Sequence, residues 1–373
     1  MQTFGARAIK NYDYLVSKKS VPHNLRHANL ADLPALADLL TKVFTHDAIP
    51  IVQTVEELEE DFATESSRLD NDVMVVEINS KIVGLAYTVF LPSETKEERC
   101  YVFGGVAPEF RGQSVGAALM TWAVKHGEDL LQSTGRTLPK FLRTEVSQLN
   151  DSAARLFARF AMNPVRYAED LIFDLAMPAP SSRPSPTPAP TPSTQPTPYS
   201  IVPWSASRNA EARTVKNLAF QDHWGSTPTS EEHWQQLVGG TTARLEHSFF
   251  AVAPATPATP ATPTLPTSAA STPANKIIGL LLTHRYESDD ELLGKKIAWV
   301  DKLGTLAEYR NQSVAKNLIA AALAKYKSLG LTHAALTVDT QNPTGAYGLY
   351  SALGFKFFRG KTTFERQVSP HPN

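Results

Sequence analysis

Arg111-Gly-Gln-Ser-Val-Gly-Ala-Ala-Leu119 recurs later in the chain as Arg310-Asn-Gln-Ser-Val-Ala-Lys-Asn-Leu318. Each copy follows an apolar strand and opens a helix with small residues. The first turn of a helix has free backbone N–H groups and a partial positive charge, so small residues there let a pyrophosphate approach closely. Arg111 and Arg310 are expected to add a side-chain cation to the same anion. The repeat predicts two copies of one phosphate-binding fold.

Matching strands surround the two copies. Lys81-Ile-Val-Gly-Leu-Ala-Tyr-Thr88 corresponds to Lys276-Ile-Ile-Gly-Leu-Leu-Leu-Thr283. In the first half a short polar turn precedes this strand, whereas a Pro-, Ala- and Thr-rich stretch at 254–273 takes its place in the second half. Such a composition does not bury enough apolar surface to offset the entropy of ordering. We therefore predict that this stretch lengthens a β-hairpin and is not a domain boundary.

A second proline-rich stretch, at 177–198, separates the two halves of the 373-residue chain, which is too long for one ordinary domain. We predict an N-terminal extension at 1–23, an N-terminal domain at 24–176, a linker at 177–198 and a C-terminal domain at 199–369. Alternating strand and helix patterns place both domains in the α/β class, each with a mixed central sheet.

Charge and cysteine content exclude several classes of partner. The formal net charge of −1 and pI of about 6.8 give no electrostatic case for nucleic acid or a membrane surface. No apolar run is long enough to span a bilayer, and the N-terminus lacks the apolar core of a secretory signal. The single cysteine, Cys100, excludes an intramolecular disulfide and a cysteine-built zinc site. We expect a cytoplasmic monomer or homodimer that binds no metal and acts on a small molecule or peptide.

A second motif follows the loop in each half. In the second half it reads Asn342-Pro-Thr-Gly-Ala-Tyr-Gly-Leu-Tyr-Ser-Ala-Leu-Gly-Phe355. Asn342 suits a helix N-cap, Pro343 the first helical position and Gly354 the stop. A looser copy begins at Asn150 in the first half.

Together these residues resemble the GNAT superfamily of acetyl-CoA-dependent N-acetyltransferases. The loops resemble the family's Arg/Gln-x-x-Gly-x-Gly/Ala pattern, and the second motif resembles its Asn-x-x-Ala-x-x-Leu-Tyr-x-x-x-Gly-Phe pattern. Ser114 and Ser313 stand where the family has its central glycine. The tandem arrangement is similar to that of mycothiol synthase and related two-domain acetyltransferases, which leaves the acceptor amine unspecified.

The resemblance implies acetyl-CoA as the cofactor. Backbone groups of the strand before the second loop are expected to bond its pantetheine arm, because the family splays this strand from the next. Asn342 is expected to contact the same arm or to act only as a helix cap. The implied cofactor-binding residues are Leu303, Gly304, Thr305, Arg310, Asn311, Gln312, Ser313, Val314, Ala315 and Asn342 in the second half, and Val106, Arg111, Gly112, Gln113, Ser114, Val115 and Gly116 in the first.

Two asymmetries point to chemistry in the C-terminal half. Amine acetylation needs a deprotonated amine, a polarised carbonyl and a proton for the departing thiolate. The resemblance implies that Tyr350 supplies that proton, whereas Phe157 stands in its place in the first half. Period-two alternation puts Trp299, Asp301, Leu303 and Thr305 on one face of a strand, so Asp301 is a candidate base, with a solvated residue or a salt bridge as the alternative. Val102 is taken as its first-half counterpart.

The loop Phe220-Gln-Asp-His-Trp-Gly225 lies between the first two helices of the second half, where the resemblance implies acceptor binding. Asp222, His223 and Trp224 are candidates for recognising an amine and its scaffold. In the alternative interpretation Trp224 is a buried core anchor and His223 is merely exposed.

Three other functions stay open. One is a non-catalytic module that binds acetyl-CoA and senses its level. Another has the N-terminal half acetylating a protein amine, because Arg111 and its glycines form the more open loop. The third is an esterase, since Gly112-Gln-Ser-Val-Gly116 also fits the Gly-x-Ser-x-Gly nucleophile elbow around Ser114. The repeat keeps Ser313 without either glycine, and only His126 follows nearby, which favours anion binding over the esterase.

Overall fold

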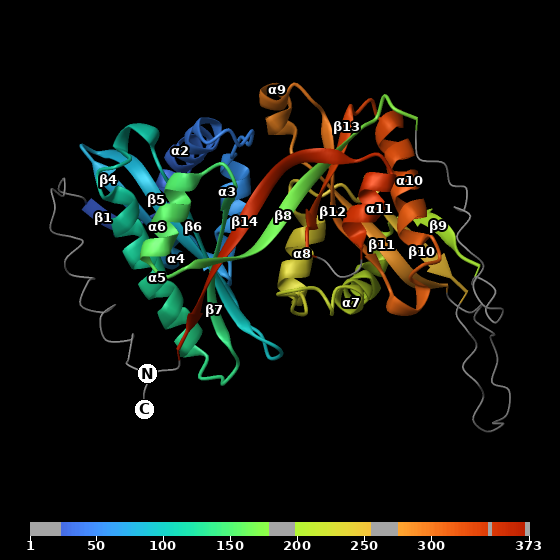
Figure 1. Cartoon of the computed structure of the whole chain (residues 1–373), viewed down its shortest axis with the longest axis horizontal. Helices are drawn as coiled ribbons and strands as arrows, with labels where there is room; N and C mark the ends of the chain where they lie inside the picture. Colours follow the sequence, from blue (N-terminus) through green and yellow to red (C-terminus); the bar gives the residue numbers. More distant parts are fainter. Residues whose placement is uncertain (1–23, 179–197, 255–274, 342–344, 370–373) are drawn as a thin grey trace. The chain divides into compact units, whose positions relative to one another are not determined.

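The computed structural model describes residues 24–178, 198–254, 275–341 and 345–369 (Figure 1). The chain divides into two compact units. Unit 1 comprises residues 1–168, 291–293 and 359–373, and unit 2 comprises residues 169–290 and 294–358. The predicted extension at 1–23, most of the linker and most of the insertion lie outside the described residues.

The first half of the chain forms a sheet flanked by helices. Its elements are β1 (Asn24–His27), α2 (Leu33–His46), α3 (Val55–Asp61), β2 (Ala63–Thr64), β3 (Ser67–Arg68), α4 (Leu69–Asp72), β4 (Val73–Ile78), β5 (Lys81–Leu91), β6 (Glu98–Val106), α5 (Val115–Ser133), β7 (Lys140–Ser147), α6 (Asp151–Arg159) and β8 (Asn163–Asp174). The second half repeats the main order of strands and helices within the described residues, without counterparts of β2, β3 and α4 and with one additional short helix, α9 (Asp290–Leu293).

The elements of the second half are β9 (Ser200–Pro203), α7 (Asn209–Ala219), α8 (Glu231–Gly239), β10 (Phe249–Ala253), β11 (Lys276–Arg285), α9 (Asp290–Leu293), β12 (Ile297–Thr305), α10 (Val314–Ser328), β13 (His333–Asp339), α11 (Ala346–Ala352) and β14 (Lys356–Val368). Within the described ranges, every helix is too short or too polar to cross a membrane.

Helices cover both faces of each sheet. In unit 1, Leu119 of α5 lies in one buried cluster with Val102 of β6, and Leu36 of α2 lies in another with Val75 of β4. In unit 2, α10 and α11 share a core with β12 and β13, while α7 and α8 share a second core with β10 and β11. The strand order is β1-β4-β5-β6-β7-β14 in unit 1 and β8-β13-β12-β11-β10-β9 in unit 2. Each unit is therefore a three-layer α/β fold with a mixed sheet.

The last strand of each unit comes from an unexpected part of the chain. The predicted N-terminal domain ends at residue 176, but the strand before that boundary is β8, and from Glu169 onwards β8 belongs to unit 2. Its Leu171 and Phe173 lie in the buried cluster of α10. In unit 1, β14 takes the place beside β7, with Lys361 to Val368 paired antiparallel to Ser147 to Lys140. Alternation within a strand does not reveal its partner, because the pairing is non-local.

The second proline-rich stretch stands between two paired strands. β10 and β11 are antiparallel, and their last pair, Ala253 with Lys276, flanks it directly. The corresponding hairpin of unit 1 ends with Ile78 paired to Lys81. Both hairpins carry a register shift close to this end. The insertion thus replaces a two-residue turn while the strand pairing stays the same.

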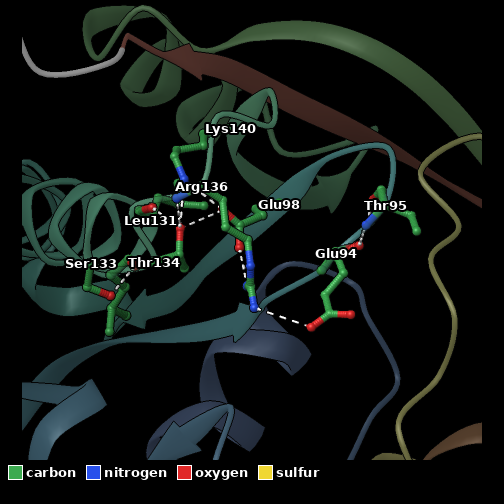
Figure 2. A network of polar contacts seen from close by, with 10 residues as sticks. Glu94, Thr95, Glu98, Leu131, Ser133, Thr134, Arg136 and Lys140 are labelled. Atoms are coloured by element: carbon green, nitrogen blue, oxygen red, sulfur yellow. Dashed lines mark hydrogen bonds and ion pairs between the residues drawn. The ribbon is translucent and has the colours of Figure 1, made fainter.

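A buried charge network closes the end of unit 1 where β6 begins (Figure 2). The Glu98 carboxylate is completely buried and accepts hydrogen bonds from Lys140 Nζ at 2.7 Å, Thr134 Oγ1 at 2.7 Å and Arg136 at 2.9 Å. Arg136 also lies 3.8 Å from Glu94. Because each charge has a partner, the network ties the end of α5 to β6 and β7.

Candidate functional site

Strand β12 parts from its neighbour halfway along its length. It pairs in parallel with β13 from Ile297 to Val300, and within the described residues the ladder goes no further. Beyond that point β12 continues to Thr305, bonded to β11 on its other side. The edge formed by Leu303, Gly304 and Thr305 therefore faces a gap between strands. Such an edge is suited to pairing with an extended molecule that carries amide groups.

Unit 1 contains the same opening. β6 pairs with β7 only as far as Tyr101, opposite Arg143, and then continues to Val106 alongside β5. Val106 thus occupies the position in unit 1 that Thr305 occupies in unit 2, immediately before the phosphate loop.

The two phosphate loops have matching backbone conformations. Ser114 and Ser313 are the N-caps of α5 and α10, and both are left-handed, with φ of 68° and 62°. Gly112 and Asn311 are also left-handed, with φ of 76° and 62°. Glycine adopts this conformation freely and asparagine tolerates it, whereas serine does so at a cost. The left-handed cap explains why the GNAT pattern has glycine where this chain has serine.

The last small residue of each loop needs little space. A Cβ atom at Gly116 would make only ordinary contacts, the nearest being Leu156 at 3.5 Å, so Ala315 fits the equivalent place. Val115 and Val314 begin the two helices and pack over the hairpin glycines Gly84 and Gly279. These contacts hold the first turn of each helix against the sheet.

Backbone N–H groups, not glutamine side chains, are what the loops offer to an anion. Gln113 Nε2 donates to the Glu109 carbonyl at 3.0 Å, and Gln312 Nε2 donates to the Glu308 carbonyl at 3.1 Å. Both side chains therefore close their own loops. Among the described residues no acceptor binds the N–H groups of 113–116 or 312–315. These four consecutive groups at a helix start form an anion site of the kind expected.

Arg111 binds a residue at the end of α2, and Arg310 binds a residue at the end of α7. The Arg111 guanidinium contacts both carboxylate oxygens of Asp47, at 2.6 and 3.0 Å, and donates to the Val106 carbonyl at 3.1 Å. Arg310 donates to the Ala219 carbonyl at 3.1 Å and lies 3.8 Å from the exposed carboxylate of Asp222. Arg111 thus already has a counter-ion, while Arg310 keeps a looser one.

Asn150, the first-half counterpart of Asn342, is fully engaged. Its Oδ1 accepts from the Ala153 N–H at 3.0 Å and from Ser152 Oγ at 2.8 Å, and its Nδ2 donates to Asp47 at 2.9 Å. Asn342 itself lies outside the described residues, and α11 begins at Ala346 after the left-handed Gly345.

Tyr350 lies on α11 with only 8% of its surface exposed. Its ring packs in the α10 core, with the Phe355 ring centroid 6.0 Å away. No described residue hydrogen-bonds its hydroxyl, and burial raises the pKa of Tyr350 to about 12. The phenol therefore keeps its proton at neutral pH. In unit 1 the corresponding buried ring is Phe157, packed against Phe364 at 5.3 Å.

A β-bulge interrupts β12 at the parting of the strands. Leu282 pairs with Lys302 and Thr283 with Val300, so Asp301 is the extra residue. Val300 and Leu303 consequently both contact the α10 core, although they stand three positions apart and strict alternation would put them on opposite faces. The predicted common face of Trp299, Asp301, Leu303 and Thr305 is therefore wrong, because alternation fails across a bulge.

The bulge also changes the comparison between halves. In unit 1 the β5–β6 register runs without a shift, and Val102 pairs with Thr88. Thr88 corresponds to Thr283, so the counterpart of Val102 is Val300. Asp301 has no counterpart in unit 1, and the predicted match of Asp301 to Val102 is corrected by one residue.

Asp301 already has a basic neighbour. Its carboxylate lies 2.9 Å from Lys302 Nζ, and both side chains are half-buried. Burial alone would raise the pKa of Asp301, but Lys302, His284 and His233 together outweigh burial and lower it. A carboxylate with a lowered pKa is a weaker base, so the salt-bridge alternative describes this residue.

The loop after α7 lies against the free part of β12. The Phe220 ring comes within 2.9 Å of the position that a Cβ atom on Gly304 would take. The His223 ring packs on Phe220 with centroids 4.6 Å apart. Trp224 is 38% exposed, so it is not the buried core anchor of the alternative interpretation. Asp222 and His223 are thus brought close to the parted strands.

The esterase interpretation lacks a general base. His126 is twelve residues along α5 from Ser114, about 18 Å at 1.5 Å per residue. Its Nε2 lies 2.7 Å from the Asp72 carboxylate, and its ring stacks on Trp122 at 5.0 Å. His126 therefore does not reach Ser114, and the left-handed serine is explained by its position at the helix start.

Comparison with known proteins agrees with this geometry. The model of the acetyltransferase (GNAT) family matches residues 33–162 and again residues 229–355. No curated protein matches the sequence significantly.

Several solved structures share the fold. A GCN5-related N-acetyltransferase from Sphaerobacter thermophilus is 21% identical, with a TM-score of 0.64 over 95% of this chain and 99% of that one. A tandem GNAT protein from the clavulanic acid biosynthesis pathway is 15% identical, with a TM-score of 0.61 over 94% of this chain and all of that one. The GCN5-related glucosamine N-acetyltransferase region of a fungal multi-domain β-N-acetylglucosaminidase is 14% identical, with a TM-score of 0.64 over 94% of this chain and 38% of that one.

Proposed function

The chain belongs to the acetyltransferase (GNAT) family as a tandem pair of acyl-CoA-dependent transferase folds, and we propose that it moves an acetyl group from acetyl-CoA to a primary amine of a small molecule or peptide. The chemistry is assigned to unit 2, and unit 1 is assigned a supporting role. We further propose a cytoplasmic location, with a monomer or homodimer as the working form.

The donor fits the parted strands of unit 2. Backbone groups of Leu303, Gly304 and Thr305 would bond the pantetheine arm, and the N–H groups of residues 312–315 would bind the pyrophosphate. The buried Thr305 Oγ1, which has no hydrogen-bond partner among the described residues, offers a further polar contact. When bound, acetyl-CoA supplies an activated acetyl group as a thioester.

The observation that carries the proposal is the buried side chain of Tyr350 on α11. A departing thiolate needs a proton, and a phenol whose pKa is raised to about 12 holds one throughout the physiological range. The bulge at Asp301 adds support, because bulges are frequent beside active sites, where they release backbone groups from strand pairing.

Unit 1 lacks these features. Phe157 has no proton to donate, the β5–β6 register has no bulge, and Asn150 is saturated by its own helix and Asp47. Its phosphate loop nevertheless keeps four N–H groups without acceptors among the described residues. We therefore assign unit 1 to scaffolding or to binding of the donor without turnover.

The test is an assay of the full chain with acetyl-CoA and a panel of amines, following release of free coenzyme A thiol. The panel holds sugar amines, polyamines, cysteinyl conjugates, amino acids and peptides. Thiol release that depends on one class of amine, with the acetylated amine identified by mass spectrometry, is the expected result. Tight acetyl-CoA binding with no amine-dependent release across the panel would instead establish the non-catalytic module and refute the proposed activity.

A further inference from the structure

In each unit the first long helix packs against a strand glycine, and the two units have different residues four positions after that contact. In unit 1, the Val43 side chain lies 3.0 Å from the place of a Cβ on Gly105, and Asp47 follows four residues later. In unit 2, Ala219 lies 3.0 Å from the place of a Cβ on Gly304, and His223 follows four residues later. Each residue thus follows the helix–strand contact by four positions, but Asp47 caps the end of α2 whereas His223 lies in the turn beyond the end of α7.

These two side chains are used differently. Asp47 is largely buried and bound to Arg111 and Asn150, so it holds the loop of unit 1 together. The ring nitrogens of His223 have no hydrogen-bond partner among the described residues, and its ring is only half-buried. In unit 1 Asp47 binds the loop arginine, and in unit 2 the Ala219 carbonyl accepts the corresponding hydrogen bond from Arg310. His223 is consequently free for another role.

The surroundings of His223 place it at the opening between β12 and β13. Its ring rests on Phe220, which itself covers Gly304 on the free part of β12. Its charged neighbours come from four elements: Arg310 of the phosphate loop, Asp339 at the end of β13, Asp222 of its own turn and Lys216 of α7. The turn is held by backbone bonds from the His223 N–H to Phe220 and from the Ser226 N–H to His223.

We propose that the His223 imidazole is the proton acceptor for the amine substrate of unit 2. The proposal rests on the proposed function and names a residue for its first step. His223 takes one proton from the substrate ammonium, and the resulting amine attacks the thioester carbonyl. The C–N bond forms, the C–S bond breaks, and the thiolate takes the Tyr350 proton. The attacking nitrogen, which carries a surplus proton once the C–N bond has formed, gives that proton to the Tyr350 phenolate and becomes the neutral amide nitrogen. His223 then releases its proton to water.

The charge balance around His223 suits this role. Burial lowers the pKa of His223, Arg310 and Lys216 lower it further, and Asp339 and Asp222 oppose the change only in part. The imidazole is therefore neutral at pH 7 and ready to accept a proton. Asp301, the other candidate, is already paired with Lys302 at 2.9 Å.

The test compares His223→Gln with wild type in the full chain, using acetyl-CoA with glucosamine, spermidine and a lysine-containing peptide as probes. Because His223 must be neutral, kcat/KM of the wild type should rise with pH through a value below the ordinary 6.5 and then level off. A second rise in kcat/KM at higher pH is expected from deprotonation of the amine substrate, and its position should change when the amine is changed. His223→Gln should lower kcat/KM by about 10²- to 10⁴-fold and abolish the first limb only.

Three further measurements separate catalysis from structure. The affinity for coenzyme A by calorimetry should stay unchanged in His223→Gln, and added imidazole should partly restore His223→Ala. NMR titration of the free wild-type protein should give His223 a pKa below 6.5. The matched control is His333→Gln, at the opposite end of β13 from Asp339, whose pKa burial also lowers. It should keep both the rate and the pH profile.

The outcomes distinguish the two proposals. A wild type that acetylates none of the amines refutes the proposed function, and the assignment of His223 with it. An active wild type whose His223→Gln variant keeps the low-pH limb overturns the His223 assignment alone. Loss of activity matched by an equal loss of coenzyme A affinity also overturns it, because His223 would then only support the loop.

Discussion

Unit 1 and unit 2 follow one plan but differ in the ion pairs that hold their strands and loops. Unit 1 buries charge where β6 begins, in the network of Glu98, and binds its phosphate loop through Asp47. Unit 2 begins its parallel ladder with the pair Ile297 and His333, whereas unit 1 begins its parallel ladder with the pair Glu98 and Lys140. The difference indicates that ion pairs stabilise unit 1 at the start of its parallel ladder and at its phosphate loop, while both units keep the opening between the parted strands.

The largest expected effect comes from replacing the aromatic residue on α11 of unit 2 or on α6 of unit 1. Tyr350→Phe removes the only proton donor that we assign in unit 2, so kcat should fall by about 10²- to 10⁴-fold. Phe157→Leu should leave kcat close to wild type, because unit 1 is assigned no catalysis. Steady-state thiol release with the best amine of the panel measures both. Equal losses in the two variants would sink the division of labour.

A companion variant tests whether the ring alone separates the units. Phe157→Tyr places a phenol on α6 of unit 1. The β5–β6 pairing still has no bulge, and Asn150 stays hydrogen-bonded to Asp47. Added to Tyr350→Phe, it should not restore thiol release. Restored turnover in this double variant would show that unit 1 lacks only the phenol.

Substitutions in the Glu98 network, where β6 of unit 1 begins, should lower the free energy of unfolding the most. Glu98→Gln leaves Lys140 and Arg136 without their buried carboxylate, which costs about 3–5 kcal/mol in a buried ion pair. In unit 2, Ile297→Val, at the first pair of the parallel ladder, should cost only about 0.5–1.5 kcal/mol. Hydrogen exchange of β6 and β12 amides reports each unit separately. Similar losses of unfolding free energy at the two positions would contradict the idea that the Glu98 ion pairs are a main source of stability in unit 1.

The same network predicts a pH dependence with a definite sign. Burial would raise the pKa of Glu98, but hydrogen bonds from Lys140, Thr134 and Arg136 outweigh it, and the pKa falls below its ordinary 4.5. The stabilisation is therefore fully present above pH 4.5 and is lost as the pH falls through the folded value. Glu98→Gln should remove this slope from the acid unfolding curve of unit 1. An unchanged slope would mean that other carboxylates produce it.

A smaller effect separates the two strand glycines. A Cβ at Gly304 would stand 2.9 Å from the Phe220 ring, and one at Gly105 would stand 3.0 Å from Val43. Gly304→Ala and Gly105→Ala should each cost about 1–3 kcal/mol through overpacking. Only Gly304→Ala should also lower kcat/KM, because Phe220 supports His223. Equal activity in both variants would show that this contact does not position the site.

Local patterns predicted much of this fold, and the failures have physical causes. The loop helices that begin at Val115 and Val314 were visible, because short-range hydrogen bonding and periodicity determine them. β14 was missed, and its partner could not have been inferred, since non-local pairing brings it beside β7. The short hairpin of β2 and β3 and the single turns α4 and α9 carry too few residues to show a period.

The site was predictable to the same extent. The loop residues and Tyr350 follow from motifs, but the bulge at Asp301 does not, because nothing in Trp-Val-Asp-Lys-Leu marks an extra residue. The role of Asp47 was also missed, and its only signal was its position just after a helix. Gly304 was named for its backbone, whereas its lack of a side chain is what admits Phe220.

The smallest expected effect concerns the two left-handed serines, and here the units should behave alike. Ser114 and Ser313 adopt φ of 68° and 62°, which costs a non-glycine residue roughly 1–2 kcal/mol. Glycine removes that cost but loses about 0.5–1 kcal/mol through the freedom of the unfolded chain. Ser114→Gly and Ser313→Gly should therefore each raise the free energy of unfolding by less than about 1 kcal/mol. Neither should weaken coenzyme A binding, because the backbone N–H groups stay in place. A large loss of affinity in Ser313→Gly alone would mean that its hydroxyl contacts the pyrophosphate, and would make that loop more specialised than its counterpart.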